Sequence, residues 1–91
     1  MNNEITDDKL DKYFDITSRA LKMAKSAPQK ENASKVIDMA QRYLSDAQHF
    51  RDKEEYVLAY GALNYAHGWL DTGAALGLFE VHDCNLFTVD E

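Results

Sequence analysis

The sequence predicts an all-α protein, a three-helix bundle that runs up, down and up and ends in a short irregular tail. Three apolar patterns that repeat every three or four residues predict the helices. Turn formers are scarce, with one proline and four glycines in 91 residues, which favours a few long helices over many short strands. We expect a single domain with helices at about 7–25, 31–51 and 55–76 and a tail at 77–91.

The first predicted helix has one apolar stripe and recognisable ends. Its stripe consists of Leu10, Tyr13, Phe14, Thr17, Ala20, Leu21 and Ala24. Thr6 is suited to cap the N-terminus, because its hydroxyl can accept a hydrogen bond from the first turn. Asp7 and Asp8 follow it, where negative charge favours the helix dipole. Pro28 predicts the end of the helix, because the residue before a proline avoids helical geometry.

The second predicted helix is equally amphipathic. Its stripe consists of Ala33, Val36, Ile37, Ala40, Tyr43, Leu44, Ala47 and Phe50. The charged run from Arg51 to Glu54 predicts a tight connection to the next helix. No glycine marks this turn, so the sequence leaves its boundary open by a few residues.

The third predicted helix is apolar on two faces. One face consists of Tyr56, Ala59, Tyr60, Leu63, Ala66, His67, Leu70 and Ala74. The other consists of Leu58, Ala62, Tyr65, Trp69 and Leu76. Two neighbouring helices in a domain of this size can cover one broad face of a third helix, but not both faces. The second face is therefore expected to pack under the tail or to form a homodimer interface.

Glycines mark two features of the third helix. Gly61, Gly68 and Gly73 lie inside it, where each costs about 1 kcal/mol relative to alanine. They therefore predict the close approach of another backbone or side chain. Gly77 is suited to the C-cap position, after which the tail either folds back on the bundle or makes a short extended pairing.

Charge is unevenly distributed along this acidic chain, whose net charge is −6. Residues 1–53 contain all ten Lys and Arg residues and nine acids, whereas residues 54–91 contain seven acids and no base. Such a surface repels phosphate backbones, so no nucleic-acid partner is expected. Polar residues near the middle of the third helix argue against a membrane span. The polar N-terminal segment and the lone Cys84 predict a cytoplasmic protein.

A polar strip on the third helix is the candidate ligand site. It consists of Tyr60, Asn64, His67 and Asp71, and Asp71 is the only formally charged side chain between Tyr56 and Phe79. His67 and Asp71 are four residues apart and share a helical face. Apolar surroundings raise the pKa of a carboxylate and a nearby imidazolium lowers it, which suits proton transfer or ligand binding. The competing interpretation, a purely structural His–Asp hydrogen bond, is favoured because buried polar pairs are usually structural.

Metal binding and catalysis have little support in the sequence. His67 and Asp71 offer two weak candidate ligands, whereas a closed zinc site needs about four, so no metal or other cofactor is expected. No Gly-rich phosphate loop, nucleophile elbow or His-Glu-x-x-His helix is present. We therefore expect no catalytic residues and no enzymatic activity.

The run Ala-Leu-Asn-Tyr-Ala-His-Gly-Trp-Leu-Asp-x-Gly at 62–73 resembles a family of short archaeal proteins called domain of unknown function 357. The pattern Tyr43-Leu44-x-Asp46-Ala47 also fits, although the turn at 53–56 lacks the expected glycine followed by an acid. The resemblance implies a closed bundle with a left-handed twist, an archaeal and cytosolic setting, and no known activity. Its motif residues would be Asn64, His67, Gly68, Trp69, Asp71 and Gly73.

Two functions of different classes remain in view. The first is a non-catalytic helical interaction and assembly module that forms a homodimer through its third helix or binds another, unidentified protein. Its interface candidates are Leu58, Tyr65, Trp69 and Leu76. The alternative is a small-molecule or metal-binding protein that uses Asn64, His67 and Asp71.

Overall fold

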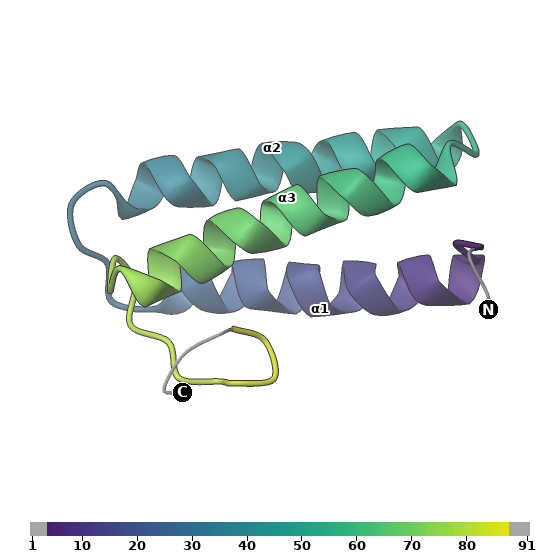
Figure 1. Cartoon of the computed structure of the whole chain (residues 1–91). Coiled ribbons are helices and arrows are strands. Elements are labelled where there is room, and N and C mark those ends of the chain that lie inside the picture. Colours follow the sequence, from purple (N-terminus) through teal and green to yellow (C-terminus); the bar gives the residue numbers. More distant parts are fainter. Residues whose placement is uncertain (1–3, 88–91) are drawn as a thin grey trace.

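The computed structural model describes residues 4–87, and three helices of equal length make up most of them. Helix α1 runs Asp7–Ser26, α2 runs Ala33–Asp52 and α3 runs Tyr56–Ala75. They run up, down and up in a bundle, which confirms the predicted fold class (Figure 1). The predicted boundaries agree with the observed ones to within two residues. None of the three helices combines the length and apolar character needed to cross a membrane.

The ends of α1 follow the sequence signals, whereas α2 begins two residues later than expected. The Thr6 hydroxyl accepts a hydrogen bond of 3.2 Å from the backbone N–H of Lys9, which confirms the predicted N-cap. After Ser26 the backbone turns extended at Ala27, with ψ of 158°, as the residue before a proline requires. Asn32 has a φ of 75° and therefore stands outside α2, because a left-handed residue cannot continue a right-handed helix.

The turn between α2 and α3 is closed by hydrogen bonds around a left-handed residue. The backbone N–H of Glu55 donates to the carbonyl oxygen of Phe50 at 2.9 Å, and that of Glu54 donates to Arg51 at 2.9 Å. This pair of bonds is the Schellman motif that commonly ends a helix. Glu54 has a φ of 61°, so a glutamate takes the conformation that glycine usually adopts there.

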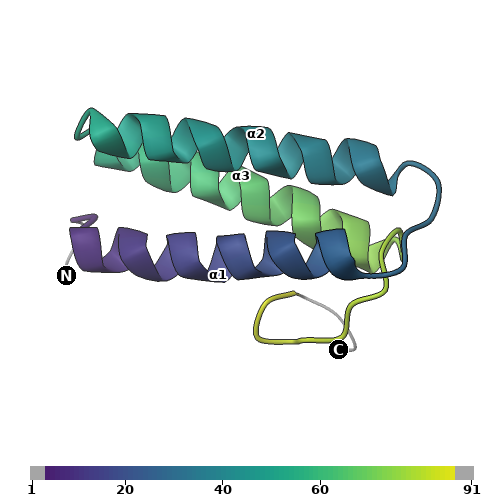
Figure 2. The same cartoon turned by 180° about the vertical axis from the view of Figure 1, so that it is seen from behind.

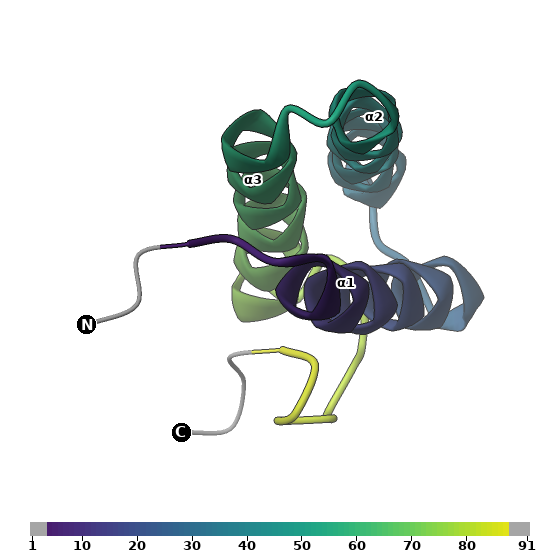
Figure 3. The same ribbon diagram turned by 90° about the vertical axis from the view of Figure 1, so that its right-hand side faces the viewer.

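The helices pack unequally. Helices α2 and α3 make the most extensive contact, while α1 contacts each of them over a smaller area. Figure 3 shows α1 crossing beneath the α2–α3 pair rather than running alongside it. One core cluster lies towards the start of α1 and consists of Leu10, Ala47, Ala59, Ala62 and Leu63. Ala62 is thus a core residue, and its assignment to the second face of α3 was wrong because that position points between the helices.

An arginine ties the start of α1 to the end of α2. The Arg51 guanidinium lies 2.7 Å from the Asp11 carboxylate and 3.3 Å from that of Asp7. It also stands over the Phe14 ring, 5.5 Å from the ring centroid. Its hydrogen bond to Asp11 raises the pKa of Arg51, with a smaller contribution from Asp7. The guanidinium therefore stays charged and holds the open end of α1 against the bundle.

The tail both folds back on the bundle and makes a short extended pairing. Gly77, with φ of 69°, ends α3, and the Leu78 N–H donates to the Gly73 carbonyl oxygen at 2.9 Å. An isolated antiparallel bridge then joins Phe79 to Gln29. Beyond it the chain loops under the side of α1 that faces away from α2 (Figures 1 and 2). Its buried side chains, which join the second core cluster, are Phe79, Val81, Leu86 and Phe87.

The described part of the tail does not cover the second apolar face of α3. Leu58 is 52% exposed, Tyr65 64%, Trp69 37% and Leu76 67%. The prediction that this face packs under the tail is therefore wrong for residues up to 87. The reason is physical: the tail follows the apolar notch between α1 and the end of α3, which lies on the other side of that helix.

Candidate functional site

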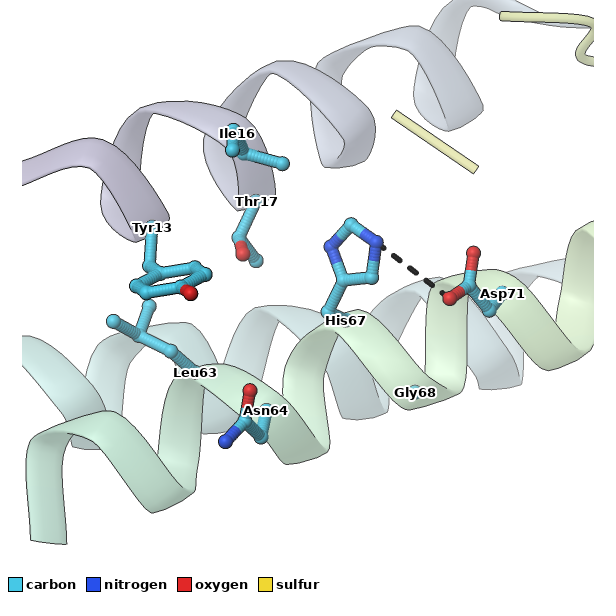
Figure 4. A pocket seen from close by; sticks show the side chains of 8 residues that line it. All are labelled: Tyr13, Ile16, Thr17, Leu63, Asn64, His67, Gly68 and Asp71. Atoms are coloured by element: carbon cyan, nitrogen blue, oxygen red, sulfur yellow. Dashed lines mark ion pairs between the residues drawn. The ribbon is translucent and has the colours of Figure 1, made fainter. Parts of the chain in front are cut away.

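A cavity of about 420 Å³ lies between α1 and α3. Three members of the predicted polar strip, Asn64, His67 and Asp71, line it from α3. The facing wall comes from α1, and the full lining is Tyr13, Ile16, Thr17, Leu63, Asn64, His67, Gly68 and Asp71 (Figure 4). Helix α1 crosses α3 obliquely (Figure 3), and Gly68, which has no side chain to fill the space, leaves the rim of the cavity open.

His67 and Asp71 form a pair on the floor of this cavity. The Nε2 atom of His67 lies 3.6 Å from Oδ2 of Asp71, and both side chains are 28% exposed. This distance is too long for a good hydrogen bond, so the contact between the two side chains is loose. In Figure 4 the imidazole stands between the two helices, with its second ring nitrogen on the side away from Asp71. The pair therefore stabilises the orientation of the ring and leaves it reachable from the cavity.

Tyr60, the fourth member of the predicted strip, supports the cavity wall instead of lining it. Its ring meets that of Tyr13 edge to face, with centroids 5.1 Å apart and planes at 68°. A hydrogen bond with Tyr60 raises the pKa of Tyr13, with the charge of Tyr60 and burial adding to the shift. The residue spacing correctly predicted that Tyr60 shares a face of α3 with the rest of the strip. Tyr60 lies one turn before Asn64, however, and does not reach the cavity.

The wall from α1 was not anticipated. Tyr13 and Thr17 were assigned to the apolar stripe of the first helix, and Ile16 was assigned no role. Thr17, a buried polar side chain in an otherwise apolar stripe, is the residue that could have indicated this wall. The position of Thr17 relative to His67 depends on the rotation of α1 about its own axis, and this rotation cannot be predicted from the sequence.

A second feature lies on the outer side of α3. Here we define the outer stripe as Leu58, Gly61, Tyr65, Gly68, Trp69, Thr72 and Leu76. Apart from the adjacent pair Gly68 and Trp69, its members follow one another every three or four residues. A shallow hollow of about 360 Å³ lies in it and is lined by Asn64, Tyr65, Gly68, Trp69 and Thr72. Tyr43 of α2 stacks on Tyr65, with ring centroids 5.2 Å apart, and so supports the stripe from one side.

The helical glycines divide into two groups. A Cβ atom added to Gly73 would lie 2.5 Å from the Phe79 ring, so the expected close approach is confirmed at this position. A Cβ added to Gly61 or Gly68 would meet nothing within 4 Å. Packing within the described chain therefore accounts for Gly73 and gives no reason for the two glycines of the outer stripe.

The two residues named as weak metal candidates gain no further ligand. Within residues 4–87, no three His, Cys, Asp or Glu side chains gather closely enough to hold a metal ion. His82 lies near Glu80 instead, with 3.7 Å between Nε2 and Oε1, on the exposed tail. Cys84 is also exposed and forms no disulfide.

Comparison with known proteins identifies the family of the chain. Residues 12–79 match the model of the family described as "Protein of unknown function (DUF357)". The chain belongs to this DUF357 family. The match confirms the resemblance seen in the motif at 62–73 and covers α2, α3 and most of α1 of this DUF357 protein. No curated protein and no solved structure matches the chain.

Proposed function

We propose that this protein is a non-catalytic helical module that self-associates through the outer stripe of α3, in an archaeal cytoplasm. The exposure of the large apolar side chains on that stripe carries the proposal. Contiguous exposed apolar patches on soluble domains commonly mark interaction sites. The cellular setting rests on the acidic sequence with its single cysteine and on the family resemblance.

The charge distribution favours a second copy of the chain as the occupant. Two copies with a net charge of −6 each repel one another, and this repulsion is weakest when they meet on a surface without acids. The outer stripe contains no charged residue from Leu58 to Leu76. A basic partner would find no counter-charge on this stripe, whereas a second apolar stripe would lose no solvated charge on contact.

The order of side chains along the stripe also suits a two-fold axis. Leu58 and Leu76 are equally distant in sequence from position 67, and so are Tyr65 and Trp69. If two α3 helices cross there in opposite directions, Leu58 of one copy lies beside Leu76 of the other, and Tyr65 beside Trp69. Gly68 lies next to the crossing point and has open space around it, so the helix axes can approach closely.

Light scattering on the purified protein tests this function. The expected molar mass is about twice the 10.4 kDa of one chain. Trp69→Glu places a charge at the centre of the stripe and should return the mass to that of one chain. Ser18→Glu adds the same charge on the exposed face of α1 and should leave the dimer intact. A wild-type protein that stays monomeric at millimolar concentration would rule the proposal out.

A further inference from the structure

We propose that the cavity between α1 and α3 binds a small organic ammonium ion. The charged group would lie against Asp71 and His67, and the organic part would lie against the α1 wall. The proposal rests on the charge, the hydrogen-bond acceptors and the apolar walls of the cavity. The cavity shares Asn64 and Gly68 with the hollow of the outer stripe, whereas Asp71 and His67 line the cavity alone. The binding test therefore uses a variant designed not to self-associate.

The charge of the cavity and of the whole chain favours a positively charged ligand. Asp71 is the only formally charged residue among the eight that line the cavity, and no Lys or Arg is among them. No Lys or Arg follows Lys53 in the sequence, so all of α3 lacks both, and the whole chain carries a net charge of −6. A cation entering this space gains from both the near carboxylate and the overall field, whereas an anion is opposed by both.

The acceptors of the cavity point to a ligand that carries N–H groups. A neutral His67 ring that carries its proton on Nε2 directs that proton at the Asp71 carboxylate. The other ring nitrogen, Nδ1, then accepts hydrogen bonds, and Figure 4 places it on the side away from Asp71. The amide oxygen of Asn64 is a further acceptor on the same wall. An ammonium group provides several donors for such a set.

The remaining walls fit an apolar body of modest size. Ile16 and Leu63 are aliphatic, and the Tyr13 ring is held in place by Tyr60, whose ring it meets edge to face. An aromatic ring also attracts a nearby cation through its electron-rich face. The volume of about 420 Å³ lies within the usual range for small-molecule sites. From Asn64 to Asp71 the helix rises about 10 Å, enough for one ring and a short amine arm.

Three probes of nearly equal shape test the inference: 2-phenylethylammonium, 2-phenylethanol and 3-phenylpropanoate. Each is titrated into ¹⁵N-labelled Trp69→Glu protein, so that association does not contribute, and amide shifts are followed by NMR. The ammonium ion should give saturable shifts at residues 13–17 and 63–71. The alcohol should bind about tenfold more weakly or worse, and the carboxylate should give no saturable shift.

Two substitutions and one control complete the experiment. Asp71→Asn should weaken the binding of the ammonium ion by about tenfold. Asp46→Asn removes the same charge from an exposed site on α2 and should leave that affinity unchanged. Ile16→Ala should lower the affinities for the ammonium ion and for the alcohol by the same factor, because it removes only apolar contact. Equal binding of all three probes, shifts confined to the outer stripe, or no saturation by the ammonium ion would overturn the inference.

Discussion

The glycines of α3 have different structural roles at different positions, and only the structure distinguishes these roles. Gly73 lies against the buried Phe79 ring, which fills the space that a Cβ atom would need. Gly61 lies where nothing comes within 4 Å of such an atom. At the first position glycine is required by packing, and at the second it lowers helix stability without any gain within the described chain.

Alanine substitutions at these two glycines should have opposite effects. Gly73→Ala should lower the free energy of unfolding by about 1–2 kcal/mol, because displacing the Phe79 ring outweighs the gain in helix propensity. Gly61→Ala should raise it by up to about 1 kcal/mol. Both are measured by urea denaturation in the Trp69→Glu background. A stabilising Gly73→Ala would show that Phe79 does not occupy the notch.

The candidate site illustrates what residue spacing can and cannot predict. Asn64, His67 and Asp71 were predicted to share a face because they are three and four residues apart on one helix, and they do line one cavity. Whether they bind a ligand stays a prediction. Ile16 and Thr17 could not be added from the sequence, because the angle and rotation of α1 depend on packing over the whole bundle.

At the scale of elements, local chemistry determined the helix ends that could be predicted. Thr6 acts through its hydroxyl, Pro28 through its ring and Gly77 through its lack of a Cβ atom, so their effects are local and could be predicted without knowing the fold. The place of the turn before the third helix was predicted, but the left-handed conformation of Glu54 was not, because a glutamate rarely adopts a positive φ. The short span between two packed helices forces it there.

The left-handed conformation of Glu54 should be relieved by glycine. Glu54→Gly is expected to raise the free energy of unfolding by about 0.5–1 kcal/mol, because a side chain at positive φ crowds the following carbonyl. Lys53→Gly serves as the matched change, since Lys53 has φ of −90° and glycine should be mildly destabilising there. Thermal unfolding of both variants provides the measurement, and a less stable Glu54→Gly would contradict the turn geometry.

At the scale of the molecule, the tail completes the core instead of covering the free face of α3. Phe87 packs on Phe79, with ring centroids 6.2 Å apart, and both lie in the cluster with Leu21 and Leu70. The sequence predicts that the tail either folds back on the bundle or makes a short extended pairing, and the tail does both. The Phe79 ring occupies the space beside Gly73, and a glycine in a sequence does not show which residue will lie against it.

Removing the Phe87 ring should therefore destabilise the whole bundle. Phe87→Ala is expected to lower the free energy of unfolding by about 3 kcal/mol, the usual cost of emptying a buried aromatic site. Cys84→Ala, an exposed position in the same tail, should change it by less than about 0.5 kcal/mol. Chemical denaturation followed by circular dichroism measures both. An unaffected Phe87→Ala protein would mean that the tail is not part of the cooperative unit.

The family match and the core end at different places. The matched segment stops at Phe79, whereas buried apolar side chains continue to Val81, Leu86 and Phe87. A recombinant fragment cut at the family boundary would keep every matched residue, yet it would lose three side chains that the remaining helices pack against. For this protein, the limits of a minimal folding unit should be chosen by burial and not by sequence similarity.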